Sequence, residues 1–116
     1  MILADTSVWI DHLRHGNQRL GELLHDAQVA VHPFVIGELA CGTLRARGDI
    51  LALLGRLPAV PAVSHEEALH LLESRALAGR GLGWIDVHLV AAAVASRVTL
   101  WTLDRRLAAV QSVIAT

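Results

Sequence analysis

The sequence contains no lysine, and all ten of its basic residues are arginines. Several chemistries depend on a lysine, among them the phosphate-binding loop of nucleotide-binding proteins, Schiff-base catalysis, and the active sites of receiver domains and haloacid-dehalogenase-like phosphatases. The absence of lysine therefore argues against each of these functions.

Cysteine is almost absent too, because Cys41 is the only one in 116 residues. A single cysteine excludes an internal disulfide and a four-thiolate zinc site, and it favours a reducing compartment. No apolar run approaches the roughly 18 residues of a membrane-spanning helix, and acids stand near the N-terminus where a signal peptide would carry positive charge. We therefore expect a soluble, cytoplasmic protein that makes no use of a membrane.

Charged residues are scarce, at 18%, and eleven acids against ten arginines leave a net charge of −1. This balance argues against nucleic-acid binding through bulk positive charge. Hydrophobic residues make up 53% of the chain and the mean hydropathy is +0.47, which predicts a packed core. The length predicts a single domain over residues 1–116, and the apolar excess suggests a surface for a partner or a second copy.

Short apolar runs alternate with longer amphipathic segments, which predicts strands alternating with helices. We expect strands at 1–4, 28–32, 62–63, 98–102 and 113–114, and helices at 8–14, 18–26, 33–45, 49–57, 64–78, 85–96 and 105–110. Asn17 is the expected N-cap of the second helix, and Ser64 with Glu67 matches a capping box. The alternation predicts an α/β fold whose central, mainly parallel sheet has helices on both faces.

Four acids stand in apolar surroundings where a carboxylate is locally unfavourable: Asp5, Glu38, Asp86 and Asp104. Asp5 and Asp104 follow predicted strands, and open α/β sheets bind ligands beyond the carboxyl ends of their strands. Carboxylates brought together repel one another, so such a cluster usually holds a divalent cation or tunes a proton transfer. Oxygen ligands without cysteines favour Mg²⁺ or Mn²⁺. The alternative is that each acid caps a helix or pairs with an arginine.

Four segments carry a family resemblance that covers nearly the whole chain: DTSVWIDHLR near the N-terminus, HPFVIGELACG in the middle, GWIDVHLVAAA later, and LWTLDRRL near the C-terminus. Together they resemble PIN-domain ribonucleases, and most closely the VapC-type toxins of bacterial toxin–antitoxin pairs. The intervals of 33, 48 and 18 residues between the four acids suit a small member of that family.

The resemblance implies that Asp5, Glu38, Asp86 and Asp104 form a catalytic quartet that binds one or two Mg²⁺ or Mn²⁺ ions, with Asp5 and Asp86 as direct ligands. It further implies that Thr6 and Thr102 supply hydroxyls that hydrogen-bond a carboxylate or the scissile phosphate. Capping or ending an element is an equally good interpretation of these two threonines.

The same resemblance implies an endoribonuclease that hydrolyses phosphodiester bonds in RNA and acts as a toxin. It also implies a homodimer, and a cognate antitoxin whose C-terminal segment occupies an apolar groove near the acids. When the four acids are left out, ten arginines and seven other acids remain. Their net charge of +3 suits an RNA substrate. Arg80 and Arg105 are candidates to bind phosphates, and Trp84 to stack on a base.

Three other functions are alternatives for an α/β domain of this length. A receiver-type signalling domain needs a lysine near its acids, and none is present. A haloacid-dehalogenase-like phosphatase needs a second acid two residues after the first, where this chain has Ser7. A catalytically silent PIN-like binding module stays open, because the sequence does not separate it from an active nuclease.

Overall fold

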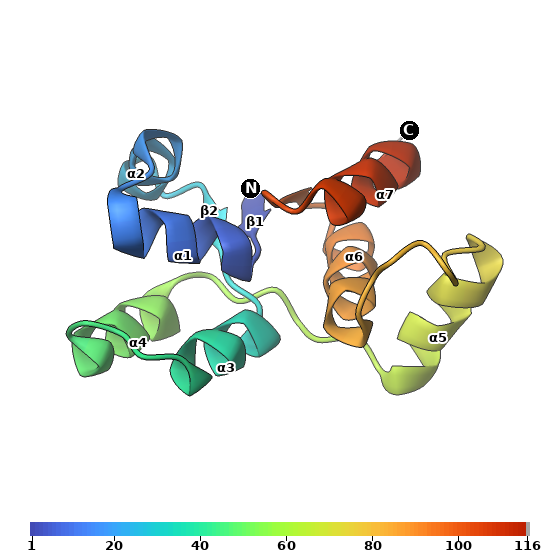
Figure 1. The fold of residues 1–116 in the computed structure, drawn as a ribbon, viewed down its shortest axis with the longest axis horizontal. Helices are drawn as coiled ribbons and strands as arrows, with labels where there is room; N and C mark the ends of the chain where they lie inside the picture. The colour runs from blue at the N-terminus through green and yellow to red at the C-terminus, as the bar shows by residue number, and fades with distance from the viewer. Residues whose placement is uncertain (116) are drawn as a thin grey trace.

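The computed structural model describes residues 1–115 and has a three-stranded parallel sheet at its centre (Figure 1). The strands are β1 (Ile2–Ala4), β2 (Val29–Ala30) and β3 (Thr99–Trp101), in the order β2-β1-β3. Leu3 of β1 pairs with Ala30 on one side and with Leu100 on the other. Because β1 is the central strand, its carboxyl end lies between the ends of its two neighbours.

Helices cover the sheet, as the alternating pattern predicted. The helices are α1 (Thr6–His15), α2 (Gln18–His25), α3 (Pro33–Cys41), α4 (Arg47–Arg56), α5 (His65–Ser74), α6 (Trp84–Ser96) and α7 (Arg105–Ala115). In Figure 1, α1 and α2 lie to one side of the strands, and α6 and α7 lie to the other. The α/β class with a parallel sheet flanked by helices is confirmed.

Helix α6 is the most deeply buried helix described, because residues 87–93 are all buried. Its three consecutive alanines, Ala91 to Ala93, allow close packing against β3 and α5. The helix turns into β3 through only two residues, Arg97 and Val98. It therefore runs back along the strand, and its N-terminus lies toward the carboxyl edge of the sheet.

The predicted capping interactions are present. The Asn17 side chain accepts a hydrogen bond from the Leu20 N–H at the start of α2, and Ser64 and Glu67 form a capping box on α5. Pro33 occupies the first turn of α3, where its missing N–H has no helical partner to lose. These polar contacts fix where the helices begin.

Two predicted strands are wrong. Residues 62–63 form no strand; the chain instead makes a single parallel bridge between Val31 and Ala59, and Pro33 lacks the N–H that would extend this pairing to Val60. Residues 113–114 lie inside α7, where Leu107, Val110 and Ile114 share the face packed on the core. The helical spacing of these three residues outweighs the strand preference of a Val-Ile pair.

Two predicted helix ends are wrong as well. The helix expected over 33–45 ends at Cys41, where the Gly42 N–H bonds to the carbonyl of Leu39. The helix expected over 64–78 ends at Ser74, shortly before Ala76 adopts a left-handed backbone with φ of +50°. Within residues 1–115, no helix combines the length and apolar character needed to cross a membrane.

Candidate active site

Asp5 lies directly after β1 and is 5% exposed. The Ser7 hydroxyl donates to Asp5 Oδ1 at 2.5 Å, the Thr102 hydroxyl donates to Oδ2 at 2.5 Å, and the Val8 N–H also reaches Oδ1. The Asp5 N–H in turn donates to the Trp101 carbonyl at 3.0 Å. Both carboxylate oxygens are thus fixed by side chains from opposite ends of the chain. We call Asp5, Ser7 and Thr102 the Asp5 hub.

Ser7 was not selected from the sequence as a site residue. Its hydroxyl lies 3.4 Å from the Thr102 hydroxyl and accepts the Leu103 N–H at 3.0 Å. The polar run that follows the first strand was the available signal, but the contact with Thr102 spans 95 residues of sequence. Only the pairing of β1 with β3 brings these two hydroxyls together.

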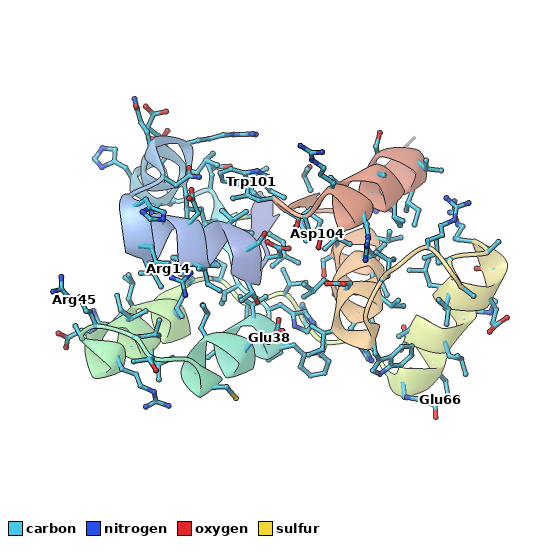
Figure 2. All side chains as sticks on the ribbon, viewed as in Figure 1. Arg14, Glu38, Arg45, Glu66, Trp101 and Asp104 are labelled. Atoms are coloured by element: carbon cyan, nitrogen blue, oxygen red, sulfur yellow. The ribbon has the colours of Figure 1, made fainter. Side chains whose placement is uncertain are left out.

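Asp104 connects to the Asp5 hub through Thr102, because the Asp104 N–H donates to the Thr102 hydroxyl at 3.0 Å. The Asp104 carboxylate is exposed and accepts the N–H groups of Arg106 and Leu107 at 2.8 and 3.1 Å. It therefore caps the start of α7. Figure 2 shows Asp104 where the chain enters that helix.

Glu38 lies exposed on α3, and its Oε1 accepts a hydrogen bond of 2.7 Å from the Thr6 hydroxyl. Thr6 is the residue next to Asp5 and begins α1. The contact joins α3 to the start of α1 and holds Glu38 beside the carboxyl end of β1. Thr6 and Thr102 thus each bond a carboxylate, the first of the two roles considered for them.

Asp86 lies in the first turn of α6, and its Oδ2 accepts the Gly83 N–H at 2.9 Å. The loop before α6 contacts the first turn of α7, because a Cβ atom at Gly81 would lie 2.7 Å from Cδ of Arg106. Gly81 also has a φ of +81°, a backbone that other residues adopt at a cost. This close approach holds the entry to α6 beside the segment that carries Asp104.

The four acids therefore come from two helices, α3 and α6, and from the ends of the two strands β1 and β3, near one edge of the sheet. Each accepts at least one hydrogen bond from a hydroxyl or a backbone N–H. Within residues 1–115, no three His, Cys, Asp or Glu side chains gather as a ready-made metal cluster. The donor set consists of carboxylate and hydroxyl oxygens, which fits Mg²⁺ or Mn²⁺ and not a soft metal. A bound cation would compete with Thr6 for Glu38 and with the Gly83 N–H for Asp86.

Arginines gather beside Asp104. Arg80, Arg105 and Arg106 line a shallow hollow of about 390 Å³ together with Ala109 and Val110 of α7. Arg80 is held in place by a hydrogen bond from its Nε to the Ala76 carbonyl at 3.2 Å. The structure brings Arg80 and Arg105 together, as two of the three residues predicted to contact RNA.

Trp84, the third of those residues, lies apart from the arginines at the start of α6 and is 39% exposed. The centroid of its ring is 4.7 Å from that of His88, and the centroid of Phe34 of α3 is 5.0 Å from that of His88. Phe34 is 36% exposed. We call Phe34, His88 and Trp84 the aromatic platform.

His88 of the aromatic platform and the neighbouring His32 are both buried. His32, which is fully buried, accepts the Phe34 N–H on Nδ1 at 2.9 Å, and its ring packs 4.9 Å from Phe34. Burial, together with the nearby His88, lowers the pKa of His32 to about 4. Burial and the nearby His65 also lower the pKa of His88. Both imidazoles are thus neutral at pH 7, and sequence reasoning assigned them no role.

An apolar groove of about 500 Å³ lies between α1 and α3 and continues along the loop 42–45 that follows α3. Ile10, Leu13, Leu39 and Leu44 line it, together with Glu38, Arg14 and Arg45. Figure 2 shows Arg14 and Glu38 between these helices. Because Glu38 lines the groove and also contacts Thr6, the groove extends to the acidic site.

The chain resembles several known proteins. The family model for the PIN domain matches residues 2–113. Ribonuclease VapC32 from two strains of Mycobacterium tuberculosis is 49% identical over 110 residues, which cover 94% of this chain and 89% of that protein. The crystal structure of PAE2754 from Pyrobaculum aerophilum matches with a TM-score of 0.68 and 18% identity, covering 94% of this chain and 83% of that one. At 18% identity, the second likeness shows the fold alone.

Proposed function

The chain belongs to the PIN-domain family, and from this premise we propose that it is a metal-dependent endoribonuclease, the VapC-type toxin of a toxin–antitoxin pair. The observation that carries the proposal is the Asp5 hub, which links a buried carboxylate to Asp104 through Thr102 and lies beside the Thr6–Glu38 pair. The 49% identity to Ribonuclease VapC32 supports the same activity.

Asp5, Glu38, Asp86 and Asp104 would hold Mg²⁺ or Mn²⁺, with Asp5 and Asp86 as the direct ligands. When bound, such a cation activates water for attack on phosphorus and neutralises charge that develops on the phosphate. Ser7 and Thr102 orient the Asp5 carboxylate through their hydroxyl protons. Thr6 orients Glu38 in the same way. The hydroxyls therefore fix the direction of two carboxylates before the substrate arrives.

RNA would lie across the edge of the sheet. Arg80 and Arg105, with Arg106 beside them, would bind backbone phosphates next to Asp104, because guanidinium groups match phosphate oxygens in a bidentate geometry. Trp84 would contact a base at the other side of the acids. The positive charge needed for RNA is thus local, which reconciles it with the net charge of −1.

The groove between α1 and α3 would receive the C-terminal segment of the antitoxin. Its leucine lining suits an apolar helix, and Arg14 and Arg45 suit acidic side chains of that partner. A homodimer is also part of the proposal. The exposed Leu69 and Val94 supply apolar surface for it beside a hollow of about 370 Å³ between α5 and α6.

The protein acts as a single PIN domain over residues 1–116 in the cytoplasm, where its RNA substrate and a reducing environment for the exposed Cys41 are found. A second candidate is a catalytically silent PIN-like binding module. One observation favours it: the four carboxylates accept hydrogen bonds from the protein itself, and no three of them gather within residues 1–115.

Incubation of total cellular RNA with the purified, antitoxin-free chain separates these two candidates. We expect discrete fragments with Mg²⁺ or Mn²⁺, none with chelator, and none from Asp5→Asn or Asp86→Asn. Asp26→Asn, an exposed acid at the end of α2, is the matched control and should cut like the parent chain. Uncut RNA together with no Mn²⁺ binding by calorimetry would favour the silent module, and cleavage that persists in chelator would contradict the metal mechanism.

A further inference from the structure

The chain leaves two of its few aromatic rings in solvent at one place. It has one phenylalanine and three tryptophans. Trp9 is 1% exposed, and the Arg19 guanidinium covers Trp101 at 4.6 Å from the ring centroid. Phe34 and Trp84, in contrast, are 36% and 39% exposed and meet the same histidine. Exposing two large rings side by side is costly in water, so their position calls for a ligand.

The rings of the aromatic platform are fixed relative to one another. His88 meets Phe34 at an interplanar angle of 64° and Trp84 at 87°, both edge-to-face arrangements. His32 supports Phe34 from the core and His65 packs 5.1 Å from Trp84. In edge-to-face packing the edge of one ring contacts the face of the next. Part of each ring therefore remains accessible to a planar ligand.

The aromatic platform adjoins two of the candidate carboxylates. Phe34 precedes Glu38 by four residues on α3, so the two share one face of that helix about one turn apart. Trp84 precedes Asp86 by two residues on α6. The surface next to these two acids therefore consists of aromatic rings. The arginines that suit phosphates lie elsewhere, beside Asp104.

We propose that Phe34 and Trp84, with His88 between them, form a stacking subsite for an unpaired nucleobase that flanks the phosphate at the acids. The inference rests on the proposed ribonuclease function and deepens it by naming the residues that would hold a base beside the phosphate at the acids. An aromatic surface suits the face of a base, which every nucleotide offers. Bases inside an RNA duplex are already stacked, so this subsite takes an unpaired base.

Binding without cleavage tests the subsite. The probes are a labelled eight-residue oligoadenylate, the same oligomer with abasic residues, and its duplex, each titrated against the Asp5→Asn chain in chelator by fluorescence anisotropy. We expect the oligoadenylate to bind most tightly. Added Trp84→Leu or Phe34→Leu should weaken that binding roughly five- to a hundred-fold and leave the abasic oligomer unaffected. Trp84→Phe keeps a ring and should retain most of the affinity.

Leu53→Ala is the matched control, because Leu53 is a 43% exposed hydrophobic residue on α4. Far-UV circular dichroism checks that each variant folds. The comparison of abasic and intact oligomers on the parent chain needs no variant, so the proposal is testable even if Trp84→Leu unfolds. Equal binding of these two oligomers, or equal affinity of parent and leucine variants, would overturn the subsite.

The outcomes also separate the subsite from the nuclease. Cleavage by the parent chain with no effect of Trp84→Leu on oligomer binding would overturn the subsite and leave the nuclease in place. Base-dependent binding without any RNA cleavage would support the subsite and count against the nuclease. If the leucine variants lose affinity only for a protein partner, the aromatic platform is a protein-docking surface and the subsite is wrong.

Discussion

Around Asp5, both carboxylate oxygens and both neighbouring hydroxyls have hydrogen-bond partners, whereas around Phe34 two buried imidazole nitrogens, His32 Nε2 and His88 Nδ1, have none among residues 1–115. The Asp5 hub is held by directional bonds with defined lengths. The aromatic platform is held by ring packing, which tolerates small shifts at little cost. One region is thus suited to a fixed charge arrangement and the other to a flat ligand of variable identity.

The largest effect should come from breaking the Asp5 hub at its centre. Asp5→Asn removes the charge but keeps a good N-cap for α1, so the chain should stay folded. Cleavage should fall at least about a hundred-fold, beyond the ten- to hundred-fold loss typical of residues that only orient a metal ligand. Single-turnover cleavage with saturating Mn²⁺ measures this. A loss below tenfold would remove Asp5 from the proposed direct ligands.

The next effect tests whether the hydroxyls orient the carboxylate. Thr102→Val preserves shape but deletes the donor to Asp5 and the acceptor for the Asp104 N–H. We expect Mn²⁺ affinity to fall roughly ten- to a hundred-fold and the free energy of unfolding to drop by about 1 to 3 kcal/mol. Calorimetry and urea denaturation measure the two quantities.

Two further variants serve as controls for Thr102→Val. Thr99→Val changes an exposed threonine at the start of β3, the strand that Thr102 follows, and should leave both quantities unchanged. Thr102→Ser retains the hydroxyl and should recover most of the Mn²⁺ affinity. If Thr102→Ser binds Mn²⁺ as weakly as Thr102→Val, the methyl group rather than the hydroxyl matters, and the orienting role is wrong.

Near the aromatic platform, lowering the pH should destabilise the folded chain through protonation of His32. Its pKa of about 4 in the folded chain lies below the ordinary value of 6.5, so folding favours the neutral ring. The resulting stability is complete above about pH 6.5 and is lost as the pH falls toward 4, by up to about 1.4 kcal/mol per pH unit. His32→Asn keeps a capping side chain and should lack this part of the slope.

Urea denaturation between pH 7.5 and 4.5 measures the difference between the two slopes. His25→Asn, at an exposed position in the last turn of α2, is the matched control and should follow the parent chain. Parallel curves for the parent and His32→Asn would mean that His32 titrates as an ordinary histidine and does not lend a neutral support to Phe34.

The smallest effect lies outside both regions. Arg105→Ala removes one guanidinium from the hollow beside Asp104. The salt dependence of single-stranded RNA binding should flatten by about 0.7 in the logarithmic slope, the value for one phosphate contact, with no change in base preference. Arg56→Ala, at the end of α4, is the control. A change in base preference would place Arg105 on a base instead.

Local patterns predicted much of this molecule. Asp5 was placed at a strand end because an apolar run stops there, and Asn17 and Ser64 marked helix starts through their side-chain oxygens. The β-branched pair Val113-Ile114 led to a wrong prediction of a strand. Its helical spacing from Leu107 determines its structure instead. A local sequence pattern predicts the structure of a residue well where that structure depends only on neighbours in the same helix or strand.

The parts that the sequence could not supply depend on contacts between distant residues. Ser7 looked like an ordinary first-turn serine until the pairing of β1 and β3 brought Thr102 against it. Phe34 and His88 belong to different helices, and no spacing indicates that their rings meet. The site residues carried by the family resemblance came without these supporting partners, which only the fold reveals.

The position of β1 between β2 and β3 has a consequence for protein synthesis. The first strand is made early, but its neighbour on one side and the hydroxyl that bonds Asp5 come from residues 99–102. A ribosome must therefore translate as far as residue 102 before Asp5 Oδ2 can accept its hydrogen bond from Thr102. A nascent chain that ends before this residue lacks that bond, so the candidate site cannot be completed while only the first strand and its following helices have been made.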